Sequence, residues 1–418
     1  MTDYRLKYVD LLKDILSEAS SFSSIKNDID DKNKAFFNML FMTTFRQLTF
    51  IKEEILPLFV KKKISKKQDI LQYVLYLGIV ELLFLDTPSY AIINSYVEIA
   101  KTKTDKFGAN FVNAVLRNVA RQKDKLLNNR KSKYFSKEFL KILRQDYSAQ
   151  EIKDMEEFVN IEPMLDLTFK PSVKPKFTDY IKLDFDTIRL SSNIKVTELD
   201  GFGDGDFWVQ DASSSMAVKC LSDDLTNKNV LDLCAAPGGK TAQLLSRGAK
   251  VNAIDISQDR IDILKKNIKR LNLEKNLNIE CIDALCYEAN DKFDIILVDA
   301  PCSATGTFRR HPEILHTKTI GDVKKMSQIQ EKILDKATSL LKNNGIIIYA
   351  TCSLSKAEGE VQIRKFLNKY KDFNIKEINI AGTSLMKTKE GFLRILPQHL
   401  KDFSGTDGFF VACLQRKN

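Results

Sequence analysis

The chain has 418 residues, 44% apolar and 29% charged, and its 65 Lys and Arg against 55 Asp and Glu give a net charge of +10. This length is typical of two to three domains, and the basic excess favours a polyanionic partner such as nucleic acid, although lysine-rich proteins without one are common. The longest apolar run, residues 70–85, contains Gln72 and Glu81 and is shorter than the ~20 residues of a membrane span. Residues 1–20 are charged throughout, unlike a secretory signal, and seven widely spaced cysteines are typical of reduced thiols. We therefore expect a cytoplasmic protein that does not enter a membrane.

Residues 1–125 are expected to form an all-helical domain. Glycine is scarce there, Pro occurs only at positions 57 and 88, and apolar residues recur every three to four positions. Residues 35–41 predict the apolar face of an early helix. Residues 70–78 are apolar on nearly every side, which predicts a central buried helix that stops before Pro88. Two more helices are predicted over residues 91–101 and 107–121.

Residues 126–205 are expected to form a basic linker and a small α+β subdomain that binds RNA. The chain is strongly basic between residues 121 and 153, for example over residues 130–133. Such a run is typical of a solvated linker or helix face, and a phosphate-contacting surface is the functional alternative. Short β-like runs follow at residues 165–169 and 180–183.

From residue 206 onward the pattern alternates between strands and helices. Apolar strands are predicted at residues 229–233, 250–255, 277–282, 293–299 and 345–350, and helices at 241–245 and 259–271. Continuous apolar runs separated by helices predict a mostly parallel sheet covered on both faces. Ligands of such sheets bind beyond the carboxyl ends of the strands. Residues 206–418 are therefore predicted to be a Rossmann-like α/β domain, and residues 205–214 either a lid over its site or the start of a helix.

The first candidate site is the stretch LDLCAAPGGKT at residues 231–241, which follows a strand and opens a helix. Small residues and free N–H groups let a ligand approach closely there. The stretch matches neither the dinucleotide fingerprint nor the P-loop, which counts against an NAD-dependent enzyme. Asp255 and Asp283 follow the next two strands, where they could bind ribose hydroxyls and an adenine amino group. Acidic strand ends without a phosphate cradle predict S-adenosylmethionine, and helix capping is the alternative role of each aspartate.

The second candidate site consists of Cys302 and Cys352, which each follow an apolar strand. A cysteine is more often a small buried hydrophobe than a nucleophile, and we interpret the other five that way or leave them open. Two thiols beside a methyl donor predict methylation of cytosine at C5. One thiolate adds to C6 and activates C5, while the other assists release as an acid, a base or an ordering group. Asp299 is expected to hydrogen-bond the base edge, and the target base must leave any stack.

The spacing of the histidines does not predict a metal site, and the arginines near them predict a surface loop. His311 and His316 are five residues apart with Cys302 nearby, whereas zinc ligands form tighter pairs, so no metal is expected. Residues 309–313 follow the Cys302 turn. They predict either a loop that contacts an RNA backbone or a solvated loop.

Several motifs resemble a known family. Residues 206–416 resemble RNA cytosine-C5 methyltransferases of the NOL/NOP2/Sun type in CAAPGGK (234–240), DAPCS (299–303), TCS (351–353) and DGFFVA (407–412). Residues 86–91 and 111–118 are similar to the NusB-like RNA-binding domain. Together they resemble the bacterial 16S rRNA methyltransferases of the RsmB/Sun type, with a NusB-like domain over 1–125. One departure is the sequence LTFK at residues 167–170, where the family usually has an Arg-x-Asn element.

This resemblance implies roles for individual residues. In the family the cysteine of the TCS motif is the nucleophile and that of the PCS motif acts in product release. We accordingly expect the catalytic residues to be Cys352, Cys302, Asp299 and Lys240. The expected S-adenosylmethionine contacts are Cys234, Ala235, Ala236, Pro237, Gly238, Gly239, Lys240, Asp255, Arg260, Asp283 and Asp299.

The preferred interpretation is a monomeric enzyme that methylates a cytosine in 16S rRNA. The same chemistry on tRNA or 23S rRNA is one alternative, since the helical domain favours 16S rRNA only by analogy. A non-catalytic NusB-like RNA-binding or assembly factor is another. The presence of both cysteines and of every cofactor-binding acid counts against this last alternative.

Overall fold

The computed structural model describes residues 2–17, 31–61, 64, 68–131, 134–184, 187–191 and 194–417. The chain forms two compact units. The helical unit contains Met1–Lys141 and His311–Lys318, and the sheet unit contains Ile142–Arg310 and Thr319–Asn418. Residues 132 and 133 of the basic run lie outside the described residues. Within the described residues, no helix has the length and apolar character needed to cross a membrane.

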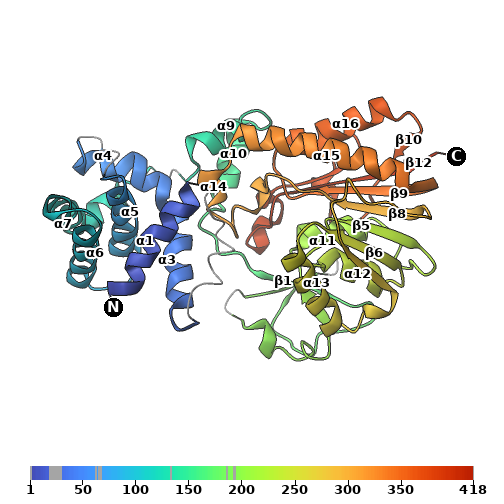
Figure 1. The fold of residues 1–418 in the computed structure, drawn as a ribbon, viewed down its shortest axis with the longest axis horizontal. Helices are drawn as coiled ribbons and strands as arrows, with labels where there is room; N and C mark the ends of the chain where they lie inside the picture. Colours follow the sequence, from blue (N-terminus) through green and yellow to red (C-terminus); the bar gives the residue numbers. More distant parts are fainter. Residues whose placement is uncertain are drawn as a thin grey trace. The chain divides into compact units, whose positions relative to one another are not determined.

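The helical unit is built around the predicted central helix. Helix α5 (Ile70–Phe84) is buried along most of its length and packs against α1, α3, α6 and α7. It ends at Phe84, where Leu85 turns extended and Pro88 precedes the next helix. The helices predicted around residues 35–41, 91–101 and 107–121 are confirmed (Figure 1) as α3 (Asp31–Phe50), α6 (Ser89–Lys103) and α7 (Lys106–Arg121). The sequence pattern did not single out the other helices of this part of the chain, which are α1 (Thr2–Leu16), α4 (Leu56–Phe59), α8 (Lys123–Asn128), α9 (Lys137–Leu143) and α14 (Ile314–Thr317).

One buried charge ties three of these helices together. Glu81 of α5 is fully buried and accepts hydrogen bonds from Arg5 Nε of α1 and from Tyr96 Oη of α6, both at 3.0 Å. A buried carboxylate is tolerated only when it is paired and hydrogen-bonded. Glu81 therefore fixes the relative rotation of α1, α5 and α6 in an otherwise apolar core.

The sheet unit begins with α10 (Ala149–Glu156) and a small antiparallel sheet. Its strand order is β2 (Ile181–Leu183), β3 (Thr187–Leu190), β1 (Leu165–Phe169) and β4 (Phe207–Val209). Strands β1 and β2 confirm the two predicted β-like runs, whereas β3, β4 and the order of the strands were not predicted. Arg189 and Asp166 form a buried ion pair at 2.6 Å across this sheet. Asp166 also accepts from the backbone N–H of Ala212 at 2.9 Å, at the start of α11 (Ala212–Lys219). The ion pair thereby attaches the small sheet to the rest of the unit.

The large sheet confirms the five predicted strands. Strands β7 (Leu277–Cys281), β6 (Lys250–Asp255), β5 (Asn229–Leu233), β8 (Phe293–Asp299) and β9 (Leu341–Thr351) are parallel neighbours in this order. An antiparallel edge that the pattern did not predict follows β9. It consists of β12 (Phe409–Arg416), β10 (Phe373–Ile375) and β11 (Leu393–Ile395).

Helices cover both faces of this sheet because successive side chains of its strands point to opposite sides. Val230 and Ile348 belong to the core under α11, α12 (Gly239–Ser246) and α13 (Gln258–Arg270). Leu231 and Ile347 belong to the core under α15 (Ile320–Leu340) and α16 (Glu360–Lys369). Figure 1 shows these two helical layers on either side of β8 and β9. The carboxyl ends of the parallel strands share one edge, and the loops that follow them carry the candidate site.

Candidate functional site

Two loops carry the candidate cysteines to the same edge of the sheet. Strands β8 and β9 are parallel neighbours, with Asp299 opposite Ala350. The loops that follow place Cys302 Sγ 3.3 Å from Cys352 Sγ, and both thiols are half-buried. The structure therefore brings together two side chains that are fifty positions apart in the sequence.

The two thiols differ in their electrostatic environment. The contact with Cys352 and burial raise the pKa of the Cys302 thiol well above its ordinary value, and the negative charge of Glu358 acts in the same direction. Cys302 therefore keeps its proton at neutral pH, and either sulfur can be the donor in the contact between them. A thiol that stays protonated is suited to an assisting role rather than to that of the nucleophile.

Backbone contacts interlock three segments around these thiols. The N–H of Gly306, in the Cys302 loop, donates to the Cys352 carbonyl at 2.9 Å, and the N–H of Gly408 donates to the Gly306 carbonyl at 2.8 Å. A Cβ at Gly306 would lie only 2.0 Å from the Gly408 oxygen. Glycine at 306 therefore permits a backbone approach that no other residue allows.

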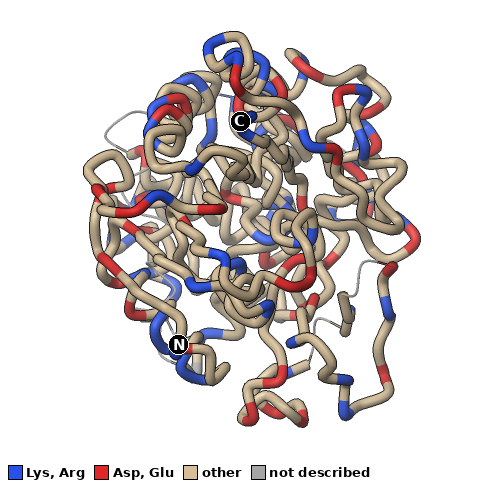
Figure 2. Tube along the Cα trace, turned by 90° about the vertical axis from the view of Figure 1, so that its right-hand side faces the viewer, with Lys and Arg blue, Asp and Glu red and all other residues tan. Residues whose placement is uncertain are grey.

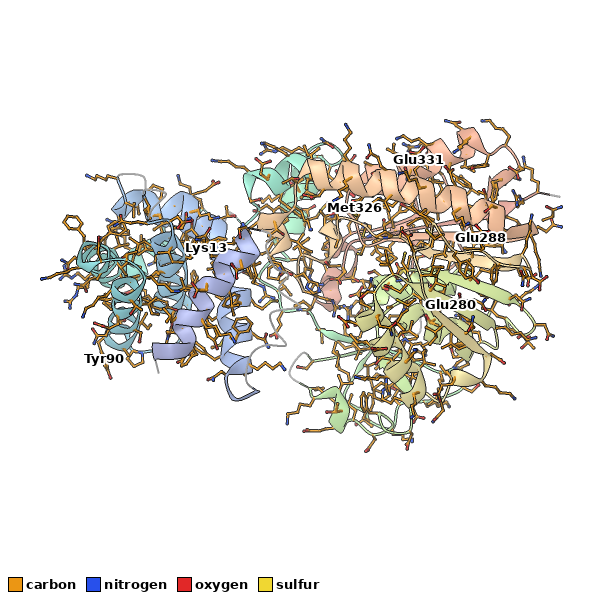
Figure 3. The ribbon with its side chains drawn as sticks, viewed as in Figure 1. Lys13, Tyr90, Glu280, Glu288, Met326 and Glu331 are labelled. Atoms are coloured by element: carbon orange, nitrogen blue, oxygen red, sulfur yellow. The ribbon has the colours of Figure 1, made fainter. Side chains whose placement is uncertain are left out.

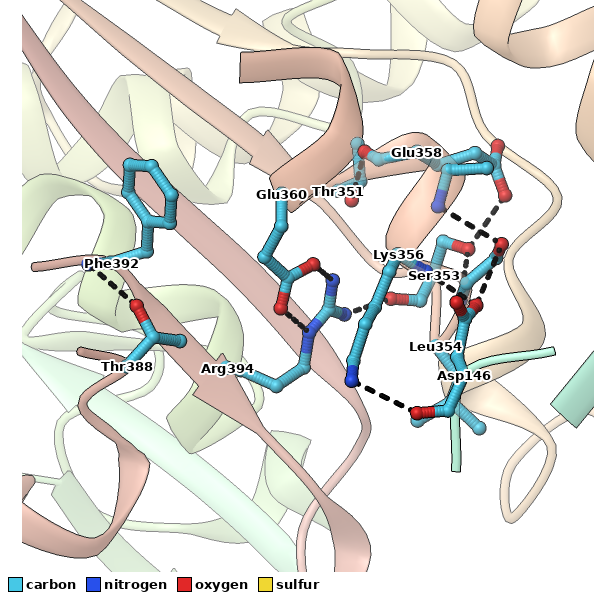
Figure 4. Close-up of polar contacts among 12 residues, drawn as sticks. Asp146, Thr351, Ser353, Leu354, Lys356, Glu358, Glu360, Thr388, Phe392 and Arg394 are labelled. Atoms are coloured by element: carbon cyan, nitrogen blue, oxygen red, sulfur yellow. Dashed lines mark hydrogen bonds and ion pairs between the residues drawn. The ribbon is translucent and has the colours of Figure 1, made fainter. Parts of the chain in front are cut away.

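The Cys352 loop is also held from its outer side. Tyr147 Oη donates to the Leu354 carbonyl at 2.7 Å, and the N–H of Lys356 donates to Asp146 Oδ2 at 2.8 Å. Figure 4 shows Asp146 beside Lys356 in this loop. Residues 146 and 147 lie just before α10, so the segment that opens the sheet unit fixes one side of the loop that carries Cys352.

Lys240 and Asp299 connect the glycine-rich loop to the Cys302 loop. Lys240 Nζ donates to Asp299 Oδ2 at 2.7 Å, and the Lys240 side chain is 9% exposed. Its ammonium also lies 5.2 Å from the centre of the Phe409 ring, a favourable cation–π distance. The structure thus brings these two predicted residues into direct contact, one from the glycine-rich loop and one from the end of the strand that precedes the Cys302 loop.

The glycine-rich loop has the shape of a ligand-binding turn. Gly238 has φ of +101° directly before α12, and a Cβ there would lie 3.0 Å from Leu264 Cγ. Asp255 is buried at the end of β6, where it accepts from the N–H groups of Ala236 at 3.2 Å and Ser257 at 3.1 Å, with Arg260 at 3.3 Å. Each carboxylate oxygen accepts more than one hydrogen bond, so Asp255 retains capacity for ribose hydroxyls.

Asp283 lies two residues beyond β7, which ends at Cys281. It is half-buried, and its Oδ1 accepts from the N–H of Leu285 at 2.9 Å. One oxygen of Asp283 therefore caps the backbone of the following turn, which is the alternative role considered for this residue. One oxygen of the carboxylate has no such contact within the described residues, which fits an adenine amino group. The loop, Asp255 and Asp283 together fit a nucleoside cofactor without a diphosphate.

Asp232 is a buried carboxyl to which the sequence pattern assigned no role. It is fully buried in β5, and its Oδ2 accepts from Thr241 Oγ1 at 2.6 Å, while its Oδ1 has no hydrogen-bond partner among the residues that the structure describes. Burial raises its pKa to about 7, although the Thr241 hydrogen bond acts in the opposite direction. The sequence offered one sign of this buried carboxyl, which is a single acidic residue within an apolar strand. Its hydrogen bond to Thr241 places it next to the glycine-rich loop.

Arg309 and Arg310, in the segment 309–313, pair with groups inside the sheet unit, whereas His311 of the same segment is exposed. Arg309 is 1% exposed and donates to the Ser404 carbonyl. Arg310 pairs with Asp211 at 2.6 Å and with Asp407 at 3.0 Å. The Arg309 side chain is therefore neither solvated nor available for an RNA backbone, and the guanidinium of Arg310, whose side chain is 27% exposed, is held by two carboxylates.

The segment 205–214 contains strand β4 (Phe207–Val209) and then the start of α11 (Ala212–Lys219). Asp211 caps α11 by accepting from the N–H of Ser213 at 2.9 Å. Burial alone would raise the pKa of Asp211, but Arg310, the Ser213 hydroxyl and Arg189 outweigh it and lower this pKa to about 2. Asp211 is therefore charged at all ordinary pH values.

The histidines have structural partners. His316 is buried in the helical unit with its Nε2 2.7 Å from the Phe45 carbonyl, and burial together with the Lys52 ammonium lowers its pKa to about 3. His311 lies 3.4 Å from Glu313, and His399 Nδ1 accepts from the N–H of Leu396 at 3.3 Å. Among the described residues, no group of three metal-ligating side chains occurs.

A separate cavity of about 710 Å³ lies beside the small sheet. Its walls include Phe169, Tyr180 and Trp208 together with Lys170 and Lys174. None of the seven cysteines lines it. Thr168, Phe169 and Lys170 line this cavity, and they belong to the segment 167–170, where the family usually has an Arg-x-Asn element.

Solved structures define the class of protein. The chain resembles PH0851 over 98% of its length, with a TM-score of 0.74 and 21% identity over 97% of that chain. It resembles a methyltransferase homologue from Pyrococcus horikoshii over 70% of its length and 98% of that chain, with a TM-score of 0.57 and 26% identity. NSun6 from the same organism, crystallised with SFG, matches over 68% of this chain and 99% of its own, with a TM-score of 0.55 and 20% identity. The sheet unit therefore has a methyltransferase fold.

Sequence relatives define the family. The family described as 16S rRNA methyltransferase RsmB/F matches residues 220–415, and the NusB family matches residues 4–121. Ribosomal RNA small subunit methyltransferase B of Serratia proteamaculans is 32% identical over 96% of this chain and 95% of its own. The Yersinia pseudotuberculosis protein of the same name is 30% identical over 97% of both chains. The chain belongs to the RsmB/F family, and the predicted enzyme class, an RNA methyltransferase, is confirmed.

Proposed function

We propose that the protein transfers a methyl group from S-adenosylmethionine to C5 of a cytosine in 16S rRNA, through a covalent bond between Cys352 and C6. The observation that carries this proposal is the pair of sulfur atoms 3.3 Å apart at the ends of neighbouring strands. Relatives named for methylation of small-subunit rRNA support the choice of substrate.

The reaction follows from the positions of the two thiols. The Cys352 thiolate adds to C6, and the electrons of the C5–C6 double bond make C5 nucleophilic. S-adenosylmethionine, when bound, supplies the electrophilic methyl group. A base then removes the C5 proton, and the electrons of that bond re-form the double bond and expel the Cys352 thiolate. The Cys302 thiol assists by donating a hydrogen bond to the departing sulfur.

The glycine-rich loop and its neighbours would hold the cofactor. The backbone of residues 234–240 approaches it, while Asp255 and Asp283 accept from its ribose and adenine. Arg260 orients Asp255, since the two side chains lie 3.3 Å apart. Asp299 hydrogen-bonds the edge of the cytosine and is itself oriented by Lys240 at 2.7 Å.

The RNA would contact both units. Tyr90 and Phe107, at the starts of α6 and α7, are 74% and 83% exposed and offer aromatic faces for unpaired bases. Figure 3 labels Tyr90 at the surface of the helical unit. The cavity beside the small sheet combines aromatic and basic side chains in a way that suits RNA. Figure 2 shows basic and acidic residues interspersed along the trace, and we assign RNA contact to these local clusters of aromatic and basic side chains.

The same proposal includes the assembly state and the location. Every side chain in this reaction comes from one chain, which suits a monomer. An rRNA substrate places the enzyme in the cytoplasm. The division into domains 1–125, 126–205 and 206–418, with RNA binding in the first two, also remains a proposal.

Mapping of 5-methylcytosine tests the proposal. Purified protein is incubated with S-adenosylmethionine and unmodified 16S rRNA, 23S rRNA and tRNA. One methylated cytosine in 16S rRNA is the expected result, and methylation of tRNA or 23S rRNA alone would refute the substrate. No methylation in any RNA, with the cofactor bound, would favour either a precursor particle as the substrate or the assembly-factor alternative.

Two cysteine variants test the chemistry. Cys352→Ala should abolish methyl transfer while cofactor affinity is retained. Cys302→Ala should accumulate a denaturant-stable RNA adduct through Cys352. Full activity of the Cys352→Ala variant would refute the assignment of Cys352 as the nucleophile. Normal turnover without an adduct in the Cys302→Ala variant would refute the role of Cys302 in product release.

A further inference from the structure

Glu358 is a buried carboxylate that contacts the loops of both cysteines. It is fully buried. Its Oε1 accepts from the N–H of Ser303 and from Gln330 Nε2, both at 2.9 Å. Its Oε2 accepts from Ser303 Oγ at 2.5 Å and from Ser353 Oγ at 2.6 Å. Ser303 and Ser353 are the residues directly after Cys302 and Cys352.

The backbone of Glu358 is itself fixed. Its carbonyl accepts from Tyr349 Oη at 2.9 Å and from Thr351 Oγ1 at 3.2 Å, both in β9. Gln330, which donates to the carboxylate, also donates to the Pro301 carbonyl at 2.9 Å. The carboxylate therefore lies at a defined distance from the sheet, and both cysteine loops are hydrogen-bonded to it.

We propose that Glu358 is a positioning residue that sets the spacing of the two reactive sulfurs, by binding the residue after each cysteine with one carboxylate. This inference rests on the two-cysteine reaction proposed above. It assigns Glu358 no proton transfer, because four donors already occupy its oxygens and it contacts neither sulfur.

Two substitutions separate the reach of this side chain from its charge. Glu358→Gln keeps the length. Its amide oxygen can accept from the two N–H donors, and its NH₂ can donate to the two hydroxyls, which rotate to accept. Glu358→Asp keeps the charge but withdraws the carboxylate by about 1.5 Å, one carbon–carbon bond. The fixed backbone prevents the shorter side chain from bonding both serines.

Glu360 provides a matched control within the same segment. It is also buried, and its carboxylate pairs with Arg394, with Nε to Oε1 at 3.1 Å and Nη2 to Oε2 at 2.5 Å. Arg394 donates to the Ser353 carbonyl at 2.6 Å, so this pair reaches the Cys352 loop alone. Figure 4 shows Glu358 and Glu360 on the two sides of this loop. Glu360→Gln therefore removes a buried charge without loosening the contact between the two loops.

The spacing of the sulfurs can be measured without RNA or cofactor. Phenylarsine oxide condenses with two neighbouring thiols and releases one water, and it binds tightly only when both sulfurs reach the arsenic. Its affinity is measured on the wild-type protein and the three variants, with Cys302→Ala as the background from the remaining thiols. Circular dichroism and the affinity for S-adenosylmethionine confirm that each variant is folded.

The reach of Glu358, and not its charge, should determine the outcome. Glu358→Gln and Glu360→Gln should keep the arsenical affinity of the wild type. Glu358→Asp should lose about tenfold, the equivalent of one lost buried hydrogen bond, and its methylation kcat should fall with it. Ser353→Ala removes the hydrogen bond from the Cys352 loop to Glu358, together with the contacts of this hydroxyl to Ser303, Thr305 and Ser355. It should show a comparable loss and serves where the aspartate variant does not fold.

Two results would overturn the inference. Wild-type arsenical affinity in a folded Glu358→Asp variant would mean that these contacts do not set the spacing. A Glu358→Gln variant that binds the arsenical normally but has lost methylation would assign Glu358 a role through its charge. Because the arsenical assay contains no RNA, failure of the proposed methylation alters neither its readout nor its interpretation.

Discussion

Replacing Gly306 with alanine tests how tightly the three segments around the thiols are interlocked. The new Cβ would lie 2.0 Å from the Gly408 oxygen, 2.6 Å from the Gly408 carbonyl carbon and 2.9 Å from the Cys352 oxygen. All three are backbone atoms, so no side chain can rotate away. Since non-bonded heavy atoms prefer separations of about 3.5 Å, the segments must move apart by roughly 1 Å or more.

Both stability and activity should fall in Gly306→Ala. Overpacking of this kind costs about 1–3 kcal/mol, which lowers the melting temperature of a unit of this size by roughly 4–8 °C for 2 kcal/mol. A displacement of about 1 Å at reacting groups costs on the order of a hundredfold in rate. Calorimetry measures the first effect, and single-turnover methylation of the RNA substrate measures the second.

Gly203→Ala is the matched control, because a Cβ at position 203 meets no atom within 4 Å. It should remain within about 0.5 kcal/mol of the wild type, as surface substitutions do. If Gly306→Ala melts and turns over like Gly203→Ala, the interlocked arrangement of the loops is wrong.

Two further predictions concern the buried carboxyl under the glycine-rich loop and the cavity beside the small sheet. With a folded pKa of about 7, Asp232 holds a proton that the unfolded chain releases near pH 4, so it makes the protein less stable as pH rises from 4 to 7. Between pH 5 and pH 8 this costs roughly 3 kcal/mol. Asp232→Asn should remove that difference in urea unfolding at the two pH values, and an unchanged difference would contradict the assignment. Lys170→Glu with Lys174→Glu should weaken RNA binding about tenfold at low salt and reduce its salt dependence, whereas unchanged binding would exclude the cavity as an RNA contact.

The sequence pattern predicted the elements well and their spatial order poorly. Strands β5 to β9 are apolar runs between helices, a local pattern that one sequence displays. The antiparallel edge was missed because residues 407–412 were considered only as a motif, although they include the start of β12 at Phe409. No local pattern states that β8 and β9 are neighbours, so the 3.3 Å contact between Cys302 and Cys352 required the structure.

Long-range polar contacts were the least predictable part of the site. Arg310 reads as a solvated or RNA-contacting charge, yet it pairs with Asp211 and Asp407, almost one hundred positions away on either side. Glu358 reads as an ordinary acid before a helix. A sequence of charges does not reveal which of them are paired, since pairing depends on the packed geometry and not on spacing along the chain.

The motifs around the cysteines therefore contain two kinds of residue. Cys302 and Cys352 are suited to react, whereas their successors Ser303 and Ser353 face inward to Glu358. Gly408 of the terminal motif likewise contacts backbone and leaves no room for a side chain at Gly306. A motif match alone treats all these positions alike. The structure distinguishes these positions by the groups they contact. Substitutions at the residues that hold the loops are therefore expected to alter the spacing of the two thiols, although both thiols remain present.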